Sequence, residues 1–183
     1  MGFLRNIRKG IMFLRTEQAP DAECLNWIKE YLSQQEYELF IQMDAGDQIH
    51  SLHVAELCRE SLQFHPEADE CIIMRAALLH DIGKIGARLG LGFRTFWVLG
   101  HKLAPWLMDR IAKRSTNTKP GTLRYRMYLQ FFHSQIGADM MRKIGVEEEV
   151  AILIEGTAET ESPSNPLPLR ILNAADGDRV FKG

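Results

Sequence analysis

The sequence predicts an all-α protein that folds as a single-domain helical bundle. Apolar residues recur at helical spacing through most of the 183-residue chain. No stretch alternates apolar and polar residues between hairpin turns, so no strand is expected. Hydrophobic residues make up 45% and charged residues 25% of the chain, which is the composition of an ordinary soluble domain with one core.

Two helices are expected before residue 47. The segment 21–32 places Leu25, Ile28 and Leu32 on one stripe. The next segment, 33–43, opens with Ser33 and Glu36, whose spacing is that of a capping box. We expect the helices within residues 1–46 to pack on a core formed by the rest of the chain.

Two further helices are expected in the middle of the chain. Residues 46–62 carry a broad apolar side. Pro66 suits the first turn of a helix, and the pattern predicts that this helix runs on to Asp81. Gly83 and Gly86 then predict that regular structure ends.

The C-terminal part predicts three more helices. Residues 122–145 form a long helical pattern that Gly145 can end. Residues 146–156 form a short helix with acidic residues in its first turn. A loop is expected from residue 162, and the final helix over residues 168–181.

Composition excludes several classes of function. The net charge of −2 gives no general attraction to nucleic acid or anionic lipid. The three cysteines form no C-x-x-C pair, so we interpret them as small core residues in a reducing compartment. The N-terminus fits neither a signal peptide nor a myristoylation site, and charges interrupt the apolar segment 89–108. The predicted location is the cytoplasm.

Residues able to bind a metal lie on the apolar faces of separate predicted helices. They are His50, His80, Asp81, His133 and Asp176. Each alone is more often a core histidine or a capping aspartate. On an ideal helix His80 and Asp81 point about 100° apart, so both can meet one metal only where the helix ends. Several helices that each aim an oxygen or nitrogen ligand inward favour a divalent metal.

At these residues the chain resembles the HD-domain metal-dependent phosphohydrolase superfamily. Its H…HD…D pattern is similar to the order His50, His80-Asp81, Asp176. The stretches "HSLHVAELC", "AALLHDIGK" and "LNAADGDRV" resemble its three ligand-bearing helices. "HSQIGADMMRKIG" resembles the extra-histidine helix of the HD-GYP phosphodiesterases and related bacterial groups. The resemblance implies that residues 47–183 form an HD-type metal-binding helical domain.

The resemblance also implies roles for individual residues. A divalent metal (Mn, Fe, Mg, Ni, Co or Zn) would be held by His50, His80, Asp81 and Asp176. In such enzymes the metal lowers the pKa of bound water and polarises a phosphoryl oxygen. Asp81 is placed to bridge two metals where two are bound. Lys84 resembles the lysine that contacts substrate phosphate in HD-x-x-K sequences, and is explained equally well as a lysine near a helix C-terminus.

His133 is expected in the same cavity without being a ligand of the first metal. It would contact phosphate or a metal-bound water, or donate a proton to the leaving group; the alternative is a core histidine bonded to a backbone carbonyl. Related groups carry further histidines where this chain has Gly156 and Thr157, so one metal site is expected and a second is unsupported. Glu155 or Glu159 would be the replacement ligand, although a solvated charge is the commoner role.

Two substrate classes are not assigned. The G-Y-P segment of the HD-GYP group is absent from the sequence. The Glu-Asp pair that follows the HD dipeptide in alarmone hydrolases is absent as well. The sequence therefore points to neither a cyclic dinucleotide nor an alarmone.

The segment 87–130 combines aromatic and basic residues, with Asp109 as its one acidic residue. The favoured interpretation is a helical hairpin whose aromatic side chains pack on the core. A lid over a polyanionic substrate ranks second. Contact with a membrane surface through residues 89–114 ranks third.

The leading hypothesis is a metal-dependent phosphohydrolase that hydrolyses a phosphoester by means of a metal-activated water. The best-matched substrate is a nucleotide or a related phosphorylated small molecule, and the predicted catalytic residues are Asp81, Lys84 and His133. The alternative is a non-catalytic HD-type module for signalling or assembly that retains a metal site. No nucleic-acid partner is expected, and the sequence does not indicate an oligomeric state.

Overall fold

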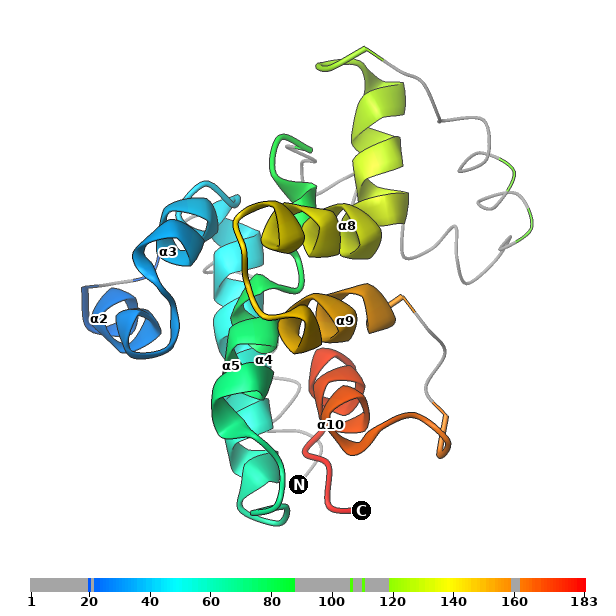
Figure 1. Cartoon of the computed structure of the whole chain (residues 1–183). Helices are drawn as coiled ribbons and strands as arrows, with labels where there is room; N and C mark the ends of the chain where they lie inside the picture. Colours follow the sequence, from blue (N-terminus) through cyan, green and yellow to red (C-terminus); the bar gives the residue numbers. More distant parts are fainter. Residues whose placement is uncertain (1–19, 21, 88–105, 107–109, 111–118, 159–161) are drawn as a thin grey trace, which may run out of the picture.

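The described part of the protein consists of helices and irregular segments. The computed structural model describes residues 20, 22–87, 106, 110, 119–158 and 162–183. No residue within these ranges lies in a strand, which confirms the predicted all-α fold (Figure 1). The helices are α2 (Ala22–Tyr31), α3 (Gln34–Phe40), α4 (Ala45–Leu62), α5 (Glu70–Leu79), the 3-10 turn η1 (Ile82–Lys84), α8 (Leu123–Lys143), α9 (Glu148–Gly156) and α10 (Leu167–Asp176).

Most of the basic aromatic segment lies outside these ranges. The three interpretations of residues 87–130, including membrane contact through 89–114, therefore stay predictions. Within the described residues, no helix is both long and apolar enough to cross a membrane. Of the cysteines, Cys58 is buried, Cys24 is half-buried and Cys71 is exposed, so the expectation of a core position is wrong for Cys71.

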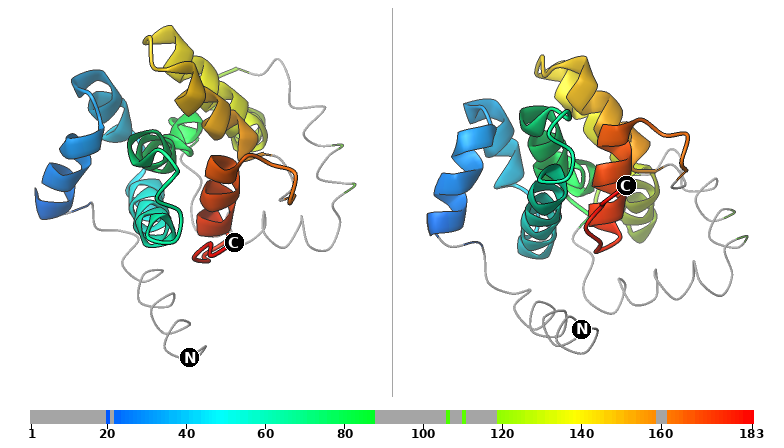
Figure 2. Two further views of the ribbon diagram at one scale, coloured as in Figure 1. Left: turned by 60° about the horizontal axis from the view of Figure 1, so that its bottom comes forward. Right: turned by 90° about the horizontal axis from the view of Figure 1, so that it is seen from below.

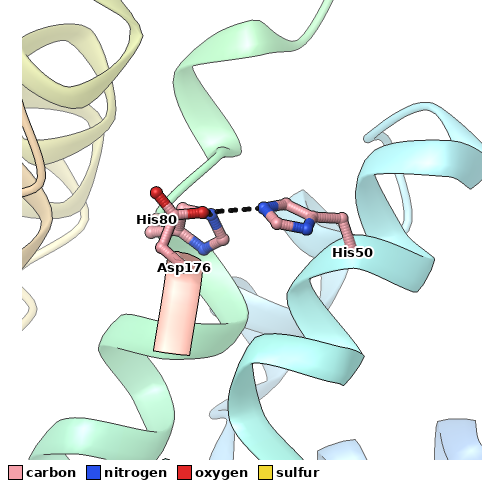
Figure 3. Close-up of side chains that lie close together, drawn as sticks. All are labelled: His50, His80 and Asp176. Carbon is pink, nitrogen blue, oxygen red and sulfur yellow. Dashed lines mark hydrogen bonds and ion pairs between the residues drawn. The ribbon is translucent and has the colours of Figure 1, made fainter. Parts of the chain in front are cut away.

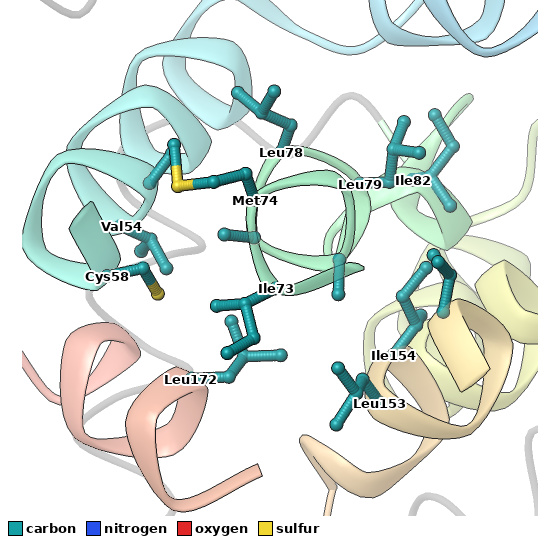
Figure 4. Close-up of a cluster of buried hydrophobic side chains, with 14 of the residues drawn as sticks. Val54, Cys58, Ile73, Met74, Leu78, Leu79, Ile82, Leu153, Ile154 and Leu172 are labelled. Carbon is teal, nitrogen blue, oxygen red and sulfur yellow. The ribbon is translucent and has the colours of Figure 1, made fainter. Parts of the chain in front are cut away.

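Helix α5 lies at the centre of the bundle. Its side chains Ile73, Met74, Leu78 and Leu79 are fully buried. Figure 4 looks along this helix and shows its side chains pointing between α4, α9 and α10. Burying one large aliphatic side chain contributes about 1.5–3 kcal/mol, so these contacts make α5 the element around which the others pack.

A buried ion pair joins the N-terminal helices to α5. The predicted capping box is present: Glu36 N donates to Ser33 Oγ (3.4 Å), and Ser33 N donates to the Glu36 carboxylate (2.8 Å). Glu36 is 0% exposed, and its other oxygen accepts from Arg75 Nε at 3.0 Å and Nη2 at 2.9 Å. Arg75 also contacts Glu147 at 2.6 Å. One arginine therefore links α3, α5 and the turn before α9.

Helix α5 begins later than the sequence pattern predicts. Asp69 is its N-cap and accepts a hydrogen bond from Ile72 N at 3.1 Å. Pro66 lies in the turn between α4 and α5, so its predicted place in the first helical turn is wrong. The reason is that the Asp69 carboxylate can satisfy an N–H group at the helix start, which a proline side chain cannot do.

Helix α10 is shorter than predicted and starts earlier. It begins at Leu167, within the predicted loop, and ends at Asp176 instead of continuing to residue 181. Asp178 has φ 62°, a left-handed conformation that cannot continue a right-handed helix. At α8 the prediction is confirmed, because Gly145 follows the helix end with φ 76°.

The backbones of η1 and α8 pack directly against each other. A Cβ atom on Gly83 would clash with the carbonyl oxygen of His133 and lie 2.8 Å from Gly137 N. A Cβ atom on Gly137 would lie 2.9 Å from Ile82 Cγ2. Helix α8 is kinked at Phe132, where φ is −113° and ψ is 15°. The glycine contact and the kink together bring His133 against the segment that follows α5.

We expect Arg75→Ala to lower the free energy of unfolding by roughly 3–5 kcal/mol, because Glu36 would remain in the core without its cation. Denaturant unfolding followed by circular dichroism measures the loss. The matched control is Arg142→Ala, which removes an arginine paired with the more exposed Glu148 and Glu155 and should change the midpoint little. Equal losses in the two variants would contradict a special role for the buried pair.

Candidate metal centre

The end of α5 places two polar side chains in the interior. The helix ends at Leu79, His80 keeps helical angles, and Asp81 leaves them with φ −95° and ψ 5°. His80 is 1% exposed and Asp81 is 2% exposed. Because the backbone turns between the two residues, their side chains approach each other, with His80 Nε2 at 3.5 Å from Asp81 Oδ1.

Two further groups reach the same point from α4 and α10. His50 Nε2 lies 2.9 Å from Asp176 Oδ1, and His80 Nε2 lies 3.6 Å from the same oxygen. Figure 3 shows the three side chains converging from separate helices. One ligand atom from each of His50, His80 and Asp176 lies within 4.8 Å of the others. This spacing allows one cation to contact all three.

The hydrogen bonds of His80 leave one ring nitrogen facing the other ligands. Its Nδ1 lies 2.9 Å from the carbonyl oxygen of Ala77, to which it can donate in the neutral ring. Its Nε2 is buried and has no hydrogen-bond partner, since the carboxylates at 3.5 and 3.6 Å are too distant. A buried nitrogen without a partner is costly, and a metal ion would satisfy it. These residues therefore fit a divalent metal.

Asp81 lies beside this group of three and is held by Lys84. The Lys84 ammonium is 2.7 Å from Asp81 Oδ1 and 2.7 Å from Oδ2. The structure therefore places Asp81 and Lys84, two of the three predicted catalytic residues, side by side next to this group. It also gives Lys84 a partner that neither of the sequence-based interpretations included.

His133 also approaches Asp81. Its Nε2 is 3.6 Å from Asp81 Oδ1, and its Nδ1 is 2.9 Å from the carbonyl oxygen of Gln130, to which it can donate. Burial lowers the pKa of His133, and the positive charge of Lys84 lowers it further, against the opposing effect of Asp81. His133 is therefore neutral at pH 7, with the lone pair of Nε2 turned toward the site.

The charges at the site are strongly coupled. Burial lowers the pKa of His80, but the carboxylates of Asp81 and Asp176 outweigh it and raise the pKa to about 9. Burial raises the pKa of Asp81, but Lys84 and the histidines hold it well below its usual range. Burial raises the pKa of Asp176 as well, but the hydrogen bond with His50 and the positive charge of the nearby His80 ring outweigh it and depress that pKa. Without a metal, a proton on His80 is the cation between two carboxylates.

The site is buried on one side and open on the other. The side chains of His80 and Asp81 are each 2% exposed, whereas those of His50 and Asp176 are 37% and 40% exposed. The sequence predicts inward positions for all of them, and this is wrong for His50 and Asp176, which lie at the rim. The difference arises because α10 ends at Asp176, so this ligand stands at the edge of the bundle.

Side-chain packing fills the space around Gly156, where the sequence predicts no ligand for a second metal. A Cβ atom on Gly156 would lie 2.9 Å from both terminal carbons of Leu169, so a histidine does not fit there without rearrangement. Glu155 accepts from Arg142 Nη2 at 2.8 Å, and Thr157 Oγ1 donates to the carbonyl oxygen of Ile154. Glu159 lies outside the described ranges. In the part of the chain that the structure covers, these positions offer no free ligand.

Comparison with known families agrees with this geometry. The family model of the HD domain matches residues 48–102. These residues are therefore similar to an HD domain over this part of the chain. The match includes His50, His80 and Asp81, whereas His133 and Asp176 lie beyond it. Searches of curated proteins and of solved structures found no match. The ligand roles of the individual HD-domain residues remain predictions.

Sequence reasoning missed one pair beside the site. His53 Nε2 lies 2.8 Å from Asp178 Oδ1. The signal was present in the spacing, because His53 follows His50 by one helical turn and Asp178 follows Asp176 by two residues. The pair was not recognised because nothing in either segment alone indicates which residues meet across the two helices.

The metal-free protein should lose stability as the pH rises. The folded-state pKa of His80, about 9, exceeds its ordinary value of 6.5, so its contribution is fully present below pH 6.5 and is lost as the pH passes 9. The loss is at most about 3 kcal/mol. Denaturant unfolding in chelator at pH 6, 7.5 and 9 measures it. His80→Gln should remove this part of the slope. His65→Gln, in the turn after α4, should keep it, and a slope unchanged in His80→Gln would contradict the assignment.

Proposed function

We propose that this protein is a metal-dependent phosphohydrolase that acts on a phosphoester, with a nucleotide or related phosphorylated small molecule as substrate. The observation that carries the proposal is the convergence of His50, His80 and Asp176 from three helices, beside the Asp81–Lys84 pair. The HD-domain match supports it, because this family is associated with metal-dependent hydrolases.

In the proposed site His50, His80 and Asp176 hold one divalent metal, and Asp81 completes the ligand set. A bound divalent metal supplies an acidified water and polarises a phosphoryl oxygen. The side chains of His50 and Asp176 are partly exposed to solvent, and the phosphate would approach from this side. The fully buried pair behind it keeps the ligand geometry rigid.

Lys84 supplies a positive charge at a defined position. An ammonium group has three N–H donors, and the two Asp81 oxygens occupy two of them. Among the described residues the third donor has no hydrogen-bond partner, and in the proposed site it would neutralise charge that develops on the phosphoryl oxygens. Asp81 therefore has two proposed tasks, which are to contact the metal and to hold Lys84 in place.

His133 is best suited to accept a proton. Its Nδ1 can donate to the Gln130 carbonyl, so in the neutral ring Nε2 carries the lone pair. The lowered pKa keeps the ring neutral at pH 7. We therefore infer that His133 takes a proton from the attacking water, and that donation to the leaving group belongs to the next stage, after His133 has been protonated.

The second candidate function is a non-catalytic module that retains a metal for signalling or assembly. The observation that favours it is the tight packing around Gly156. The HD-GYP phosphodiesterases and related groups carry further histidine ligands at this position. The presence of all four candidate ligands of one metal, together with His133, favours the enzyme. Both functions predict a bound metal, and only the enzyme predicts turnover.

The decisive experiment is metal analysis of protein purified without chelator, followed by hydrolysis assays. We expect about one metal per chain and hydrolysis of at least one member of a panel of mono-, di- and cyclic nucleotides, detected as released phosphate, nucleoside or linear nucleotide. Asp81→Ala should lose metal and activity together and keep its helical circular dichroism, because two of its partners, Lys84 and His133, are partly exposed and can be solvated once the carboxylate is removed. Stoichiometric metal with no turnover on any substrate would favour the module, and no metal in the wild type would contradict both functions.

His133→Ala should keep the metal and lose turnover by roughly the 10²–10⁴-fold typical of a lost acid–base group. The wild-type rate should rise with pH through the lowered pKa of His133, below 6.5, because only the unprotonated ring accepts a proton. The variant should lack this acidic limb. Metal loss as large as that of His80→Ala would make His133 a ligand, and unchanged turnover would leave it a packing residue.

A further inference from the structure

A second histidine–aspartate pair, His53–Asp178, connects the same two parts of the chain as the pair His50–Asp176. His53 Nε2 lies 2.8 Å from Asp178 Oδ1, and the two side chains are 30% and 21% exposed. On α4, residues three apart project from neighbouring positions of one face. The two aspartates, Asp176 and Asp178, are separated in the sequence by Gly177 alone. Each pair therefore joins α4 to the C-terminal end of α10.

The position of Asp176 makes such a contact important. Asp176 is the last residue of α10, and helix ends open more easily than helix centres. Asp178, two residues later, adopts φ 62°, which aspartate tolerates better than most residues but which still has to be held by its surroundings. A contact at Asp178 therefore restrains the segment that carries the Asp176 carboxylate.

The rest of the C-terminal segment follows α4 in the same direction. Phe181 N donates to Ser61 Oγ at 2.9 Å, and the Phe181 ring lies against His65 with centroids 5.1 Å apart. These contacts lie two or more helical turns beyond His53. They supply a natural comparison, because they attach the same segment to the same helix at a greater distance from the metal ligands.

We propose that His53 is a positioning residue: through Asp178 it holds Asp176 at the end of α10 against His50, and so sets the affinity of the site for a divalent metal. The inference rests on the proposed metal site formed by His50, His80 and Asp176. Outer partners that orient metal ligands typically change metal affinity by about 10–100-fold when they are removed. The same range is expected here.

The test is calorimetric titration of the chelator-treated full chain with Mn²⁺, repeated with Zn²⁺. His53→Ala should raise the Kd by roughly 10–100-fold. His53→Gln should recover most of the affinity, because the Gln amide nitrogen can take the place of Nε2 and donate to Asp178. Asp178→Gly keeps access to the left-handed conformation but lacks the carboxylate, so it should weaken binding as His53→Ala does.

The matched control is Ser61→Ala, which removes the hydrogen bond to Phe181 N. It should lower the thermal midpoint and leave the metal Kd at the wild-type value. The proposal is overturned by wild-type affinity in His53→Ala or Asp178→Gly, by failure of His53→Gln to recover affinity, or by an equal loss in Ser61→Ala. A wild-type protein that binds neither metal would instead overturn the metal site itself, and the inference with it.

Discussion

The central helix ends inside the bundle, and the arrangement of the site depends on that constraint. The buried side chains of Leu78 and Leu79 draw the C-terminal turn of α5 into the core, so His80 and Asp81 must follow. A buried imidazole and a buried carboxylate are unfavourable unless other groups compensate them. Here the compensation comes from the Ala77 carbonyl, from Lys84 and from the partners on α4 and α10.

The position of α8 depends on two glycines. Gly83 and Gly137 allow the backbones of η1 and α8 to approach more closely than any side chain would permit. This contact lies within one helical turn of His133 and next to Lys84, so it determines how far these two groups stand from Asp81. The kink at Phe132 then turns the helix just before the histidine. The distance between the proposed base and the proposed metal site is therefore a property of backbone packing.

Charge is divided unequally across the site. On the buried side, Asp81 is already neutralised by Lys84. On the open side, the hydrogen-bond and ion-pair partners of Asp176 among the described residues are His50 and His80, which would be neutral as metal ligands. In the proposed site a divalent cation would therefore be attracted to the rim, which is also the solvent-facing side from which the proposed phosphate substrate would approach. The same division argues for a single metal, since the lysine competes for the carboxylate that would bridge a second one.

The sequence by itself determined the all-α class, the Ser33–Glu36 capping box, the end of α5 at the HD dipeptide and the order of the candidate ligands. These features depend on helical periodicity and on the chemistry of neighbouring residues, which are local. Only the tertiary structure decided that Lys84 pairs with Asp81 and that Arg142 forms an ion pair with Glu155. It also decided that His50 and Asp176 are half-exposed at the rim of the site. The contact between His53 and Asp178 is of the same kind. Each of these depends on where helices end and how closely they cross, and periodicity along one helix carries no information about that distance.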